Sequence, residues 1–99
     1  MKLLISKAAT RDIREIWQFT ASRWSGAQAD RYYGMIIDEL QQLLVRPDSG
    51  IPVRDLKGNY LRSRVGSHFI FYRIDREQSA LMVIRILHQR MDPERRLYP

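Results

Sequence analysis

Cationic side chains that could bind phosphate or stabilise negative charge gather in the second half of this chain. Residues 50–99 hold ten Lys and Arg against five Asp and Glu, and residues 1–49 hold seven against six, within a net charge of +6. Such a set can bind phosphates or acidic side chains. The cations that could share one site are Lys57, Arg62, Arg64, Arg73, Arg85, His88 and Arg90.

The same cations could also assist RNA cleavage. A cation would stabilise the charge on phosphorus while a base activates the 2′-hydroxyl. His88 is the obvious base, because an imidazole titrates near neutral pH. Tyr98 is a more distant alternative. A ribonuclease built from this chain would therefore use His88, with Lys57, Arg62, Arg64 and Arg85 as the cations.

Other chemistries find little support in the residue types. The chain has no cysteine, no serine in a Gly-x-Ser-x-Gly setting and no Gly-rich phosphate loop. His68 and His88 lack the spacing of metal ligands. Asp38 and Glu39 are expected on a solvated helix face. We therefore expect no metal and no cofactor.

Length and composition indicate one domain over residues 1–99. No run of eighteen or more apolar residues is long enough to span a membrane. The apolar start, Met1 to Ile5, is too short for a signal peptide. We expect a cytoplasmic protein with an acidic partner, which would be a nucleic acid, an anionic protein surface, or both.

The hydrophobic pattern predicts an α+β fold in the order β-α-α-β-β-β. A short strand near residues 2–5 precedes a helix capped by Ser6, and a second helix ends at Pro47. Residues 50–59 are expected to be an irregular connector, followed by strands near 60–65, 68–74 and 80–87 and a last helical turn within 91–97. The two helices should form a hairpin packed on one face of a small, mostly antiparallel sheet and leave its other face open.

Two turns predict the strand register and therefore the two faces. A Gly66-Ser67 turn pairs Val65 with His68, Arg64 with Phe69 and Arg62 with Phe71. A loop over 75–79 pairs Ile74 with Ala80, Phe71 with Val83 and Phe69 with Arg85. The face toward the helices would hold Leu61, Val65, Ile70, Tyr72, Ile74, Met82, Ile84 and Ile86. The open face would hold Arg62, Arg64, Phe69, Phe71, Arg73, Val83, Arg85 and Leu87.

The open face, with arginines among phenylalanines, would suit recognition of a partner, because guanidinium groups stack on rings and still donate hydrogen bonds. Alternatively, the C-terminal segment or a second copy of the chain covers it. On the first helix, Trp17 is expected in the core, whereas Trp24, at the helix end, is better placed for an interface.

Several segments resemble the ParE branch of the ParE/RelE toxin superfamily. Residues 9–24 (ATRDIREIWQFTASRW) resemble its first helix, and Gln28, Ala29 and Tyr32 resemble the opening of its second. Gly66, His68 and residues 70–73 (IFYR) resemble its sheet motif. Residues 86–92 (ILHQRMD) are similar to its C-terminal signature and are the most specific of these segments.

The resemblance implies a type II toxin that is neutralised by a ParD-like antitoxin. Toxins of this branch act on DNA gyrase and block replication without a chemical reaction of their own. RelE-like members share the fold but cleave mRNA on the ribosome, and that activity is the alternative here. An inactive member that binds only its antitoxin is a third possibility.

The resemblance also assigns expected contact residues. The target-binding residues would be His88, Arg90, Met91, Arg95 and Arg96. The antitoxin would cover Trp24, Arg62, Arg64, Phe69, Phe71, Arg73 and Arg85. On this interpretation, Arg85→Glu would weaken antitoxin binding.

Overall fold

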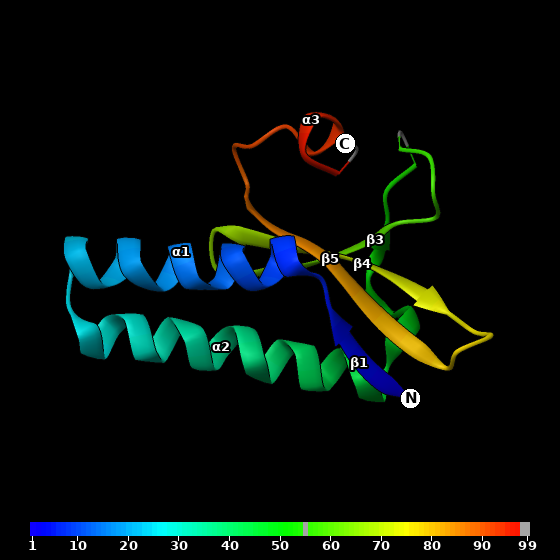
Figure 1. Cartoon of the computed structure of the whole chain (residues 1–99), viewed down its shortest axis with the longest axis horizontal. Helices are drawn as coiled ribbons and strands as arrows, with labels where there is room; N and C mark the ends of the chain where they lie inside the picture. The colour runs from blue at the N-terminus through cyan, green and yellow to red at the C-terminus, as the bar shows by residue number, and fades with distance from the viewer. Residues whose placement is uncertain (55, 98–99) are drawn as a thin grey trace.

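The computed structural model describes residues 1–54 and 56–97. Tyr98, the distant alternative base, lies outside the described residues. The elements follow the predicted order, with additional short elements (Figure 1). They are β1 (Lys2–Ile5), α1 (Lys7–Arg23), α2 (Gly26–Val45), the 3-10 helix η1 (Pro47–Ser49), β2 (Ile51–Pro52), β3 (Leu61–Val65), β4 (His68–Asp75), β5 (Ala80–His88) and α3 (Pro93–Leu97).

The strands form one sheet in the order β1-β5-β4-β3-β2. β1 runs parallel to β5, and the other neighbours are antiparallel. The predicted α+β fold, with its mostly antiparallel sheet, is confirmed. The two-residue strand β2, at the edge beside β3, was not predicted, because it falls within a Pro- and Gly-containing segment that indicates a loop.

Two serine caps start the long helices. The Ser6 hydroxyl accepts from the Ala9 N–H, as predicted, and the Ser25 hydroxyl accepts from the Gln28 N–H. α1 and α2 lie side by side as a hairpin and extend to the left of the sheet in Figure 1. Among the described residues, no helix is both long enough and apolar enough to cross a bilayer.

The main core lies between the helix hairpin and one face of the sheet. Ile36, Leu40 and Leu43 of α2 are almost fully buried against Ile70 and Tyr72 of β4. Trp17, expected in the core, instead lies at the surface of α1 with 37% of its area exposed. Its indole N–H reaches the Asp30 carboxylate of α2 at 2.9 Å, which requires the ring to stay at the helix–helix seam.

A second apolar cluster covers the face of the sheet that was predicted to be open. Phe71 and Leu87 are buried there against Tyr60 of the connector and Leu97 of α3. α3 lies on the side of the sheet opposite the helix hairpin (Figure 1). The prediction of an open face is therefore wrong, because Tyr60 of the connector and Leu97 of α3 cover Phe71 and Leu87. The alternative named the C-terminal segment as a cover but not the connector.

The register is as predicted on one side of β4 and shifted on the other. Val65 pairs with His68, Arg64 with Phe69 and Arg62 with Phe71, across a turn in which Gly66 has a φ of 56°. Between β4 and β5, however, the partners differ from those predicted. Asp75 pairs with Ala80, Ile74 with Leu81, Phe71 with Arg85 and Phe69 with Leu87, with an irregularity at Phe71 and Tyr72.

The shift in β5 changes which residues face the helices. Leu81 and Val83 enter the main core in place of Met82 and Ile84, and Ile84 packs on the second cluster instead. A bulge inserts one unpaired residue into a strand. Because side chains alternate between the two faces of the sheet, the residues before and after the bulge do not follow a single alternation. Ile86 still faces the helices, and Leu87 still lies on the opposite face, as predicted.

Candidate binding groove and basic face

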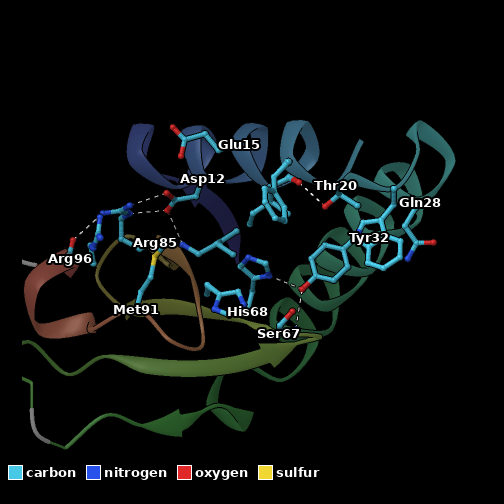
Figure 2. A pocket seen from close by; sticks show the side chains of 15 residues that line it. Asp12, Glu15, Thr20, Gln28, Tyr32, Ser67, His68, Arg85, Met91 and Arg96 are labelled. Atoms are coloured by element: carbon cyan, nitrogen blue, oxygen red, sulfur yellow. Dashed lines mark hydrogen bonds and ion pairs between the residues drawn. The ribbon is translucent and has the colours of Figure 1, made fainter. Parts of the chain in front are cut away.

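A groove of about 640 Å³ lies between two walls (Figure 2). One wall is α1 with the first turns of α2, and the other is the start of β4, the end of β5 and the C-terminal segment. The volume lies in the range typical of binding sites. The groove is lined by Asp12, Glu15, Ile16, Phe19, Thr20, Trp24, Gln28, Tyr32, Ser67, His68, Arg85, Ile86, His88, Met91 and Arg96.

Large apolar side chains along the groove remain in contact with solvent. Phe19 of α1 is 63% exposed, Trp24, directly after α1, is 74% exposed, and Met91 on the facing wall is 42% exposed. Single exposed apolar residues need no explanation, but three around one hollow mark an interaction site. Trp24 was predicted as an interface residue, and its position at the groove is consistent with that prediction.

The groove exists because β1 ends before β5 does. β1 pairs with β5 only from Ala80 to Val83, which leaves the later residues of β5 without a neighbouring strand on that edge. Side chains from the start of α1 occupy the vacant edge instead. The Ser6 hydroxyl donates to the Ile84 carbonyl at 2.7 Å, and the Asp12 carboxylate accepts from the Ile86 N–H at 3.0 Å.

Asp12 and Arg85 close one end of the groove with a two-pronged ion pair. Both Asp12 carboxylate oxygens accept guanidinium N–H bonds of 2.8 Å, and Arg85 also donates to the Arg96 carbonyl at 3.1 Å. The hydrogen bond to Asp12 raises the pKa of Arg85, and burial opposes this. The pair therefore joins α1, β5 and α3 at one point (Figure 2).

The floor of the groove carries a tyrosine and two histidines. The Tyr32 hydroxyl lies 2.6 Å from His68 Nδ1 and 2.9 Å from the Val65 carbonyl, and it accepts from the Ser67 N–H at 3.1 Å. The His68 and His88 rings meet edge to face, with centroids 5.3 Å apart.

Burial of His68 determines its protonation state. Desolvation, assisted by repulsion from His88 and opposed by Asp12, lowers the pKa of His68 from 6.5 to about 4. His68 is therefore neutral at pH 7. If its Nδ1–H donates to Tyr32, the tyrosine hydroxyl can donate to the Val65 carbonyl, which satisfies both groups. His88 Nδ1 accepts from the Arg90 N–H at 3.2 Å.

The predicted arginine–phenylalanine surface lies on the opposite side of the sheet. The Arg62 and Arg64 guanidinium groups lie over the Phe69 ring, 4.7 and 5.8 Å from its centroid. Arg73 lies over Tyr60 at 5.6 Å. Arg64 also donates to Gln89 and to the Gly66 carbonyl. We call Arg62, Arg64, Arg73 and their aromatic partners the basic face.

The structure separates residues that the sequence placed together. His88 lies in the groove on the helix side, whereas Arg62 and Arg64 lie on the basic face. Arg85, predicted on the open face, instead reaches around the free edge of β5 to Asp12. The predicted place of Arg85 on the open face is therefore wrong, and Asp12 neutralises its charge; its contact with an antitoxin stays a prediction. Phe71, predicted as an antitoxin contact, is 2% exposed and cannot meet a partner without rearrangement.

The remaining predicted contacts are placed as follows. Arg90, Met91, Arg95 and Arg96 are exposed on the C-terminal segment, and Lys57 is exposed on the connector. Three of the predicted target-binding residues line the groove: His88, Met91 and Arg96.

Sequence reasoning missed most residues of the groove, among them Asp12, Phe19 and Tyr32. Asp12 and Tyr32 were given no role, and Phe19 was not considered. Asp12 could have been found from its spacing, because it shares the apolar stripe of α1 with Ala9 and Ile16. A carboxylate on a buried stripe requires a partner.

The described residues contain no group of three or more histidine and acidic side chains that could hold a metal ion.

Comparisons with known proteins agree on one family. Residues 3–93 match the model of the ParE toxin of the type II toxin–antitoxin system, parDE. A toxin ParE1 of Mycobacterium tuberculosis is 34% identical over 96 residues, which cover 97% of each chain. A toxin ParE1 of Caulobacter vibrioides is 32% identical over 88 residues, covering 89% of this chain and 88% of the relative.

Solved structures share the fold. A chain from a chromosomal ParDE system of P. aeruginosa superposes with a TM-score of 0.73 at 15% identity, covering 89% of this chain and 95% of that one. A chain of the toxin–antitoxin complex RelBE2 from Mycobacterium tuberculosis has a TM-score of 0.68 at 20% identity, with coverage of 88% and 95%. At these identities the likeness concerns the fold alone. With the family match over residues 3–93 and relatives above 30% identity, the chain belongs to the ParE toxin family of type II toxin–antitoxin systems.

Proposed function

We propose that this toxin acts by binding DNA gyrase, without a chemical reaction of its own, and that a ParD-like protein antitoxin neutralises it. Membership of the ParE family supports a toxin role. The structure bears on the choice between a binding inhibitor and the ribonuclease alternative through the positions of the cations. Gyrase acts in the cytoplasm, and we place the toxin there with it.

The observation that carries the proposal is the separation of His88 from Arg62 and Arg64. A ribonuclease needs its base within about 3 Å of the 2′-hydroxyl proton and a cation at the adjacent phosphate. Here the sheet lies between His88 and the pair Arg62 and Arg64. Arg85 does line the groove with His88, but its guanidinium is paired with Asp12. Arg62, Arg64 and His88 therefore do not converge on one phosphodiester.

We assign target binding to the C-terminal segment from His88 to Arg96. This segment presents three arginines, Arg90, Arg95 and Arg96, none of them buried. The last turn is held by Leu97, which is 8% exposed in the second cluster, and by the Arg96 carbonyl, which accepts from Arg85. A segment anchored by these two contacts can present its outward side chains in a fixed arrangement, which lowers the entropic cost of binding.

Parallel assays of supercoiling and mRNA cleavage test the proposal. Purified toxin should block supercoiling by gyrase and leave mRNA intact in a translating extract. Arg90→Glu should weaken the block, whereas Arg46→Glu, the same change at an exposed position at the end of α2, should not. Cleaved mRNA with unaffected gyrase would overturn the proposal in favour of the ribonuclease. Inactivity in both assays, with the antitoxin still bound, would identify an inactive member of the family.

A further inference from the structure

The basic face carries positive charge that the chain does not balance. Among the residues that the structure describes, none of its three arginines forms an ion pair with a carboxylate. The Nε–H of Arg62 is buried and has no acceptor in that part of the chain. A buried donor without an acceptor requires an explanation, and a bound anion is one. We propose that the basic face binds the phosphate backbone of duplex DNA without reading its sequence.

Aromatic rings join the three cations into one surface. Arg62 and Arg64 share the Phe69 ring, whose centroid lies 6.3 Å from that of Phe71. Phe71 packs with Tyr60 in the second cluster, and Arg73 lies over the Tyr60 ring. Contact with a ring restricts each guanidinium, and because its donors form a planar fork, little further entropy is lost when it binds a phosphate.

The same rings argue against a single strand as the ligand. Proteins bind single-stranded nucleic acids by stacking the bases on exposed aromatic rings. Here two guanidinium groups lie over Phe69, one lies over Tyr60, and Phe71 is buried. Bases cannot reach these rings, so contacts with phosphates remain. Such contacts position a nucleic acid but carry no sequence information.

An acidic protein, the antitoxin included, fits this face less well than DNA does. The centre of a protein interface is usually apolar and depleted of charged residues. Here the centre is charged, since Arg62 and Arg64 lie over Phe69. An exposed apolar side chain, Ile51, lies at the edge of the sheet in β2. A ligand that carries regularly spaced phosphates complements a surface of this kind.

The choice of DNA over RNA rests on the proposed function. Arg64 donates to the side chain of Gln89, and Gln89 directly precedes Arg90 of the segment that we assign to target binding. The basic face therefore begins where the target-binding segment begins. A toxin that contacts gyrase through this segment would bring the basic face close to the DNA on which gyrase acts.

Binding of purified toxin to a duplex of about 20 base pairs, measured by fluorescence anisotropy in the absence of gyrase, tests the site. Binding should be detectable at about 50 mM salt and should weaken as salt is added. Each neutralised phosphate contributes about −0.9 to the slope of log affinity against log salt concentration. Three arginines therefore predict a slope of about −2.7 or steeper.

Substitutions with a matched control locate the contact. Arg62→Gln and Arg73→Gln should each weaken DNA binding by about fivefold or more and make the slope shallower by about one. Arg14→Gln removes the same charge from an exposed position on α1, beside a hollow between α1 and α2, and should leave the affinity within about twofold. Because Arg73 is exposed, its replacement should leave the fold intact even if Arg62→Gln does not.

The results that would overturn the site are distinct from those that would overturn the proposed function. Absence of binding at low salt, or equal losses for Arg14→Gln and Arg73→Gln, would remove the site. Tighter binding of a single strand, of an RNA duplex or of an acidic peptide of equal charge would also remove it. If the duplex binds through Arg73 but the toxin does not inhibit gyrase, the proposed function fails and the DNA site stands. Inhibition of gyrase by a toxin that does not bind DNA would have the opposite meaning.

Discussion

The ion pair between Asp12 and Arg85 should be among the most sensitive points in the fold. Asp12→Ala removes a carboxylate that accepts two guanidinium hydrogen bonds and the Ile86 N–H. Removing one partner of a fully buried pair costs about 3–5 kcal/mol, because the other charge stays buried. The Arg85 side chain is 22% exposed and keeps the Arg96 carbonyl, so we reduce this to about 2–3 kcal/mol.

The unpaired Ile86 N–H adds about 1 kcal/mol, for a total of about 3–4 kcal/mol in the free energy of unfolding. Asp12→Asn can still accept one hydrogen bond and should lose about half as much. Urea denaturation at pH 7 measures both values. The exposed pair of Asp48 and Arg76, with side chains 75% and 72% exposed, is the control, and Asp48→Ala should cost at most about 1 kcal/mol.

A double-mutant cycle separates the pair from its surroundings. Arg85→Met alone leaves Asp12 buried without a cation. The double variant should therefore be more stable than the sum of the single losses predicts, by about 1–2 kcal/mol. Additive losses, or a loss below about 1 kcal/mol for Asp12→Ala, would refute the coupling.

Three further predictions concern His68, Gly50 and Leu97. The folded pKa of His68, about 4, lies below the ordinary 6.5, so the unfolded chain binds the extra proton and stability should fall as pH drops from 6.5 toward 4. The loss should be about 1–2 kcal/mol, since the ring is only partly buried, and urea titrations of His68→Gln should lack this dependence. Gly50→Ala should destabilise by about 1–3 kcal/mol in thermal melts, because its Cβ would overlap the buried Tyr72 ring, whereas Gly34→Ala, with open space around it, should stabilise α2 by about 0.5–1 kcal/mol. Leu97→Ala should loosen α3 and reduce gyrase inhibition, measured by supercoiling, because Leu97 fixes the C-terminal segment to the second cluster.

Most of the fold followed from periodicity and turn residues. The helical stripes predicted α1 and α2 with their caps, and Gly66 fixed the β3–β4 register because its positive φ suits a tight turn. The β4–β5 register could not be predicted in the same way. Residues 80–87 are apolar at every position except Arg85, so their sequence offers little alternation to reveal a shift or a bulge.

The groove was harder to predict than the fold, because it depends on where strands end. Nothing in the sequence of β1 tells that it pairs with β5 only as far as Val83, and the vacant edge beyond is what exposes His88 and frees Arg85 to reach Asp12. The basic face, by contrast, was predicted from one correct register, and Arg62 and Arg64 do stack on Phe69. That Leu97 covers Phe71 and Leu87 on the same side of the sheet could be predicted only by knowing where the short terminal helix packs.

The second cluster and the groove together explain how a small toxin can hold its C-terminal segment in place and still leave one side of it accessible. The last residues of β5 and the turn after it have the groove on one side and the cluster of Phe71, Leu87 and Leu97 on the other. The cluster is closed and fixes the segment, whereas the groove is open and leaves one side of it accessible. A partner that fills the groove therefore need not unfold anything to reach His88, Met91 and Arg96, which line it. Binding in the groove without rearrangement is the outcome that this asymmetry favours.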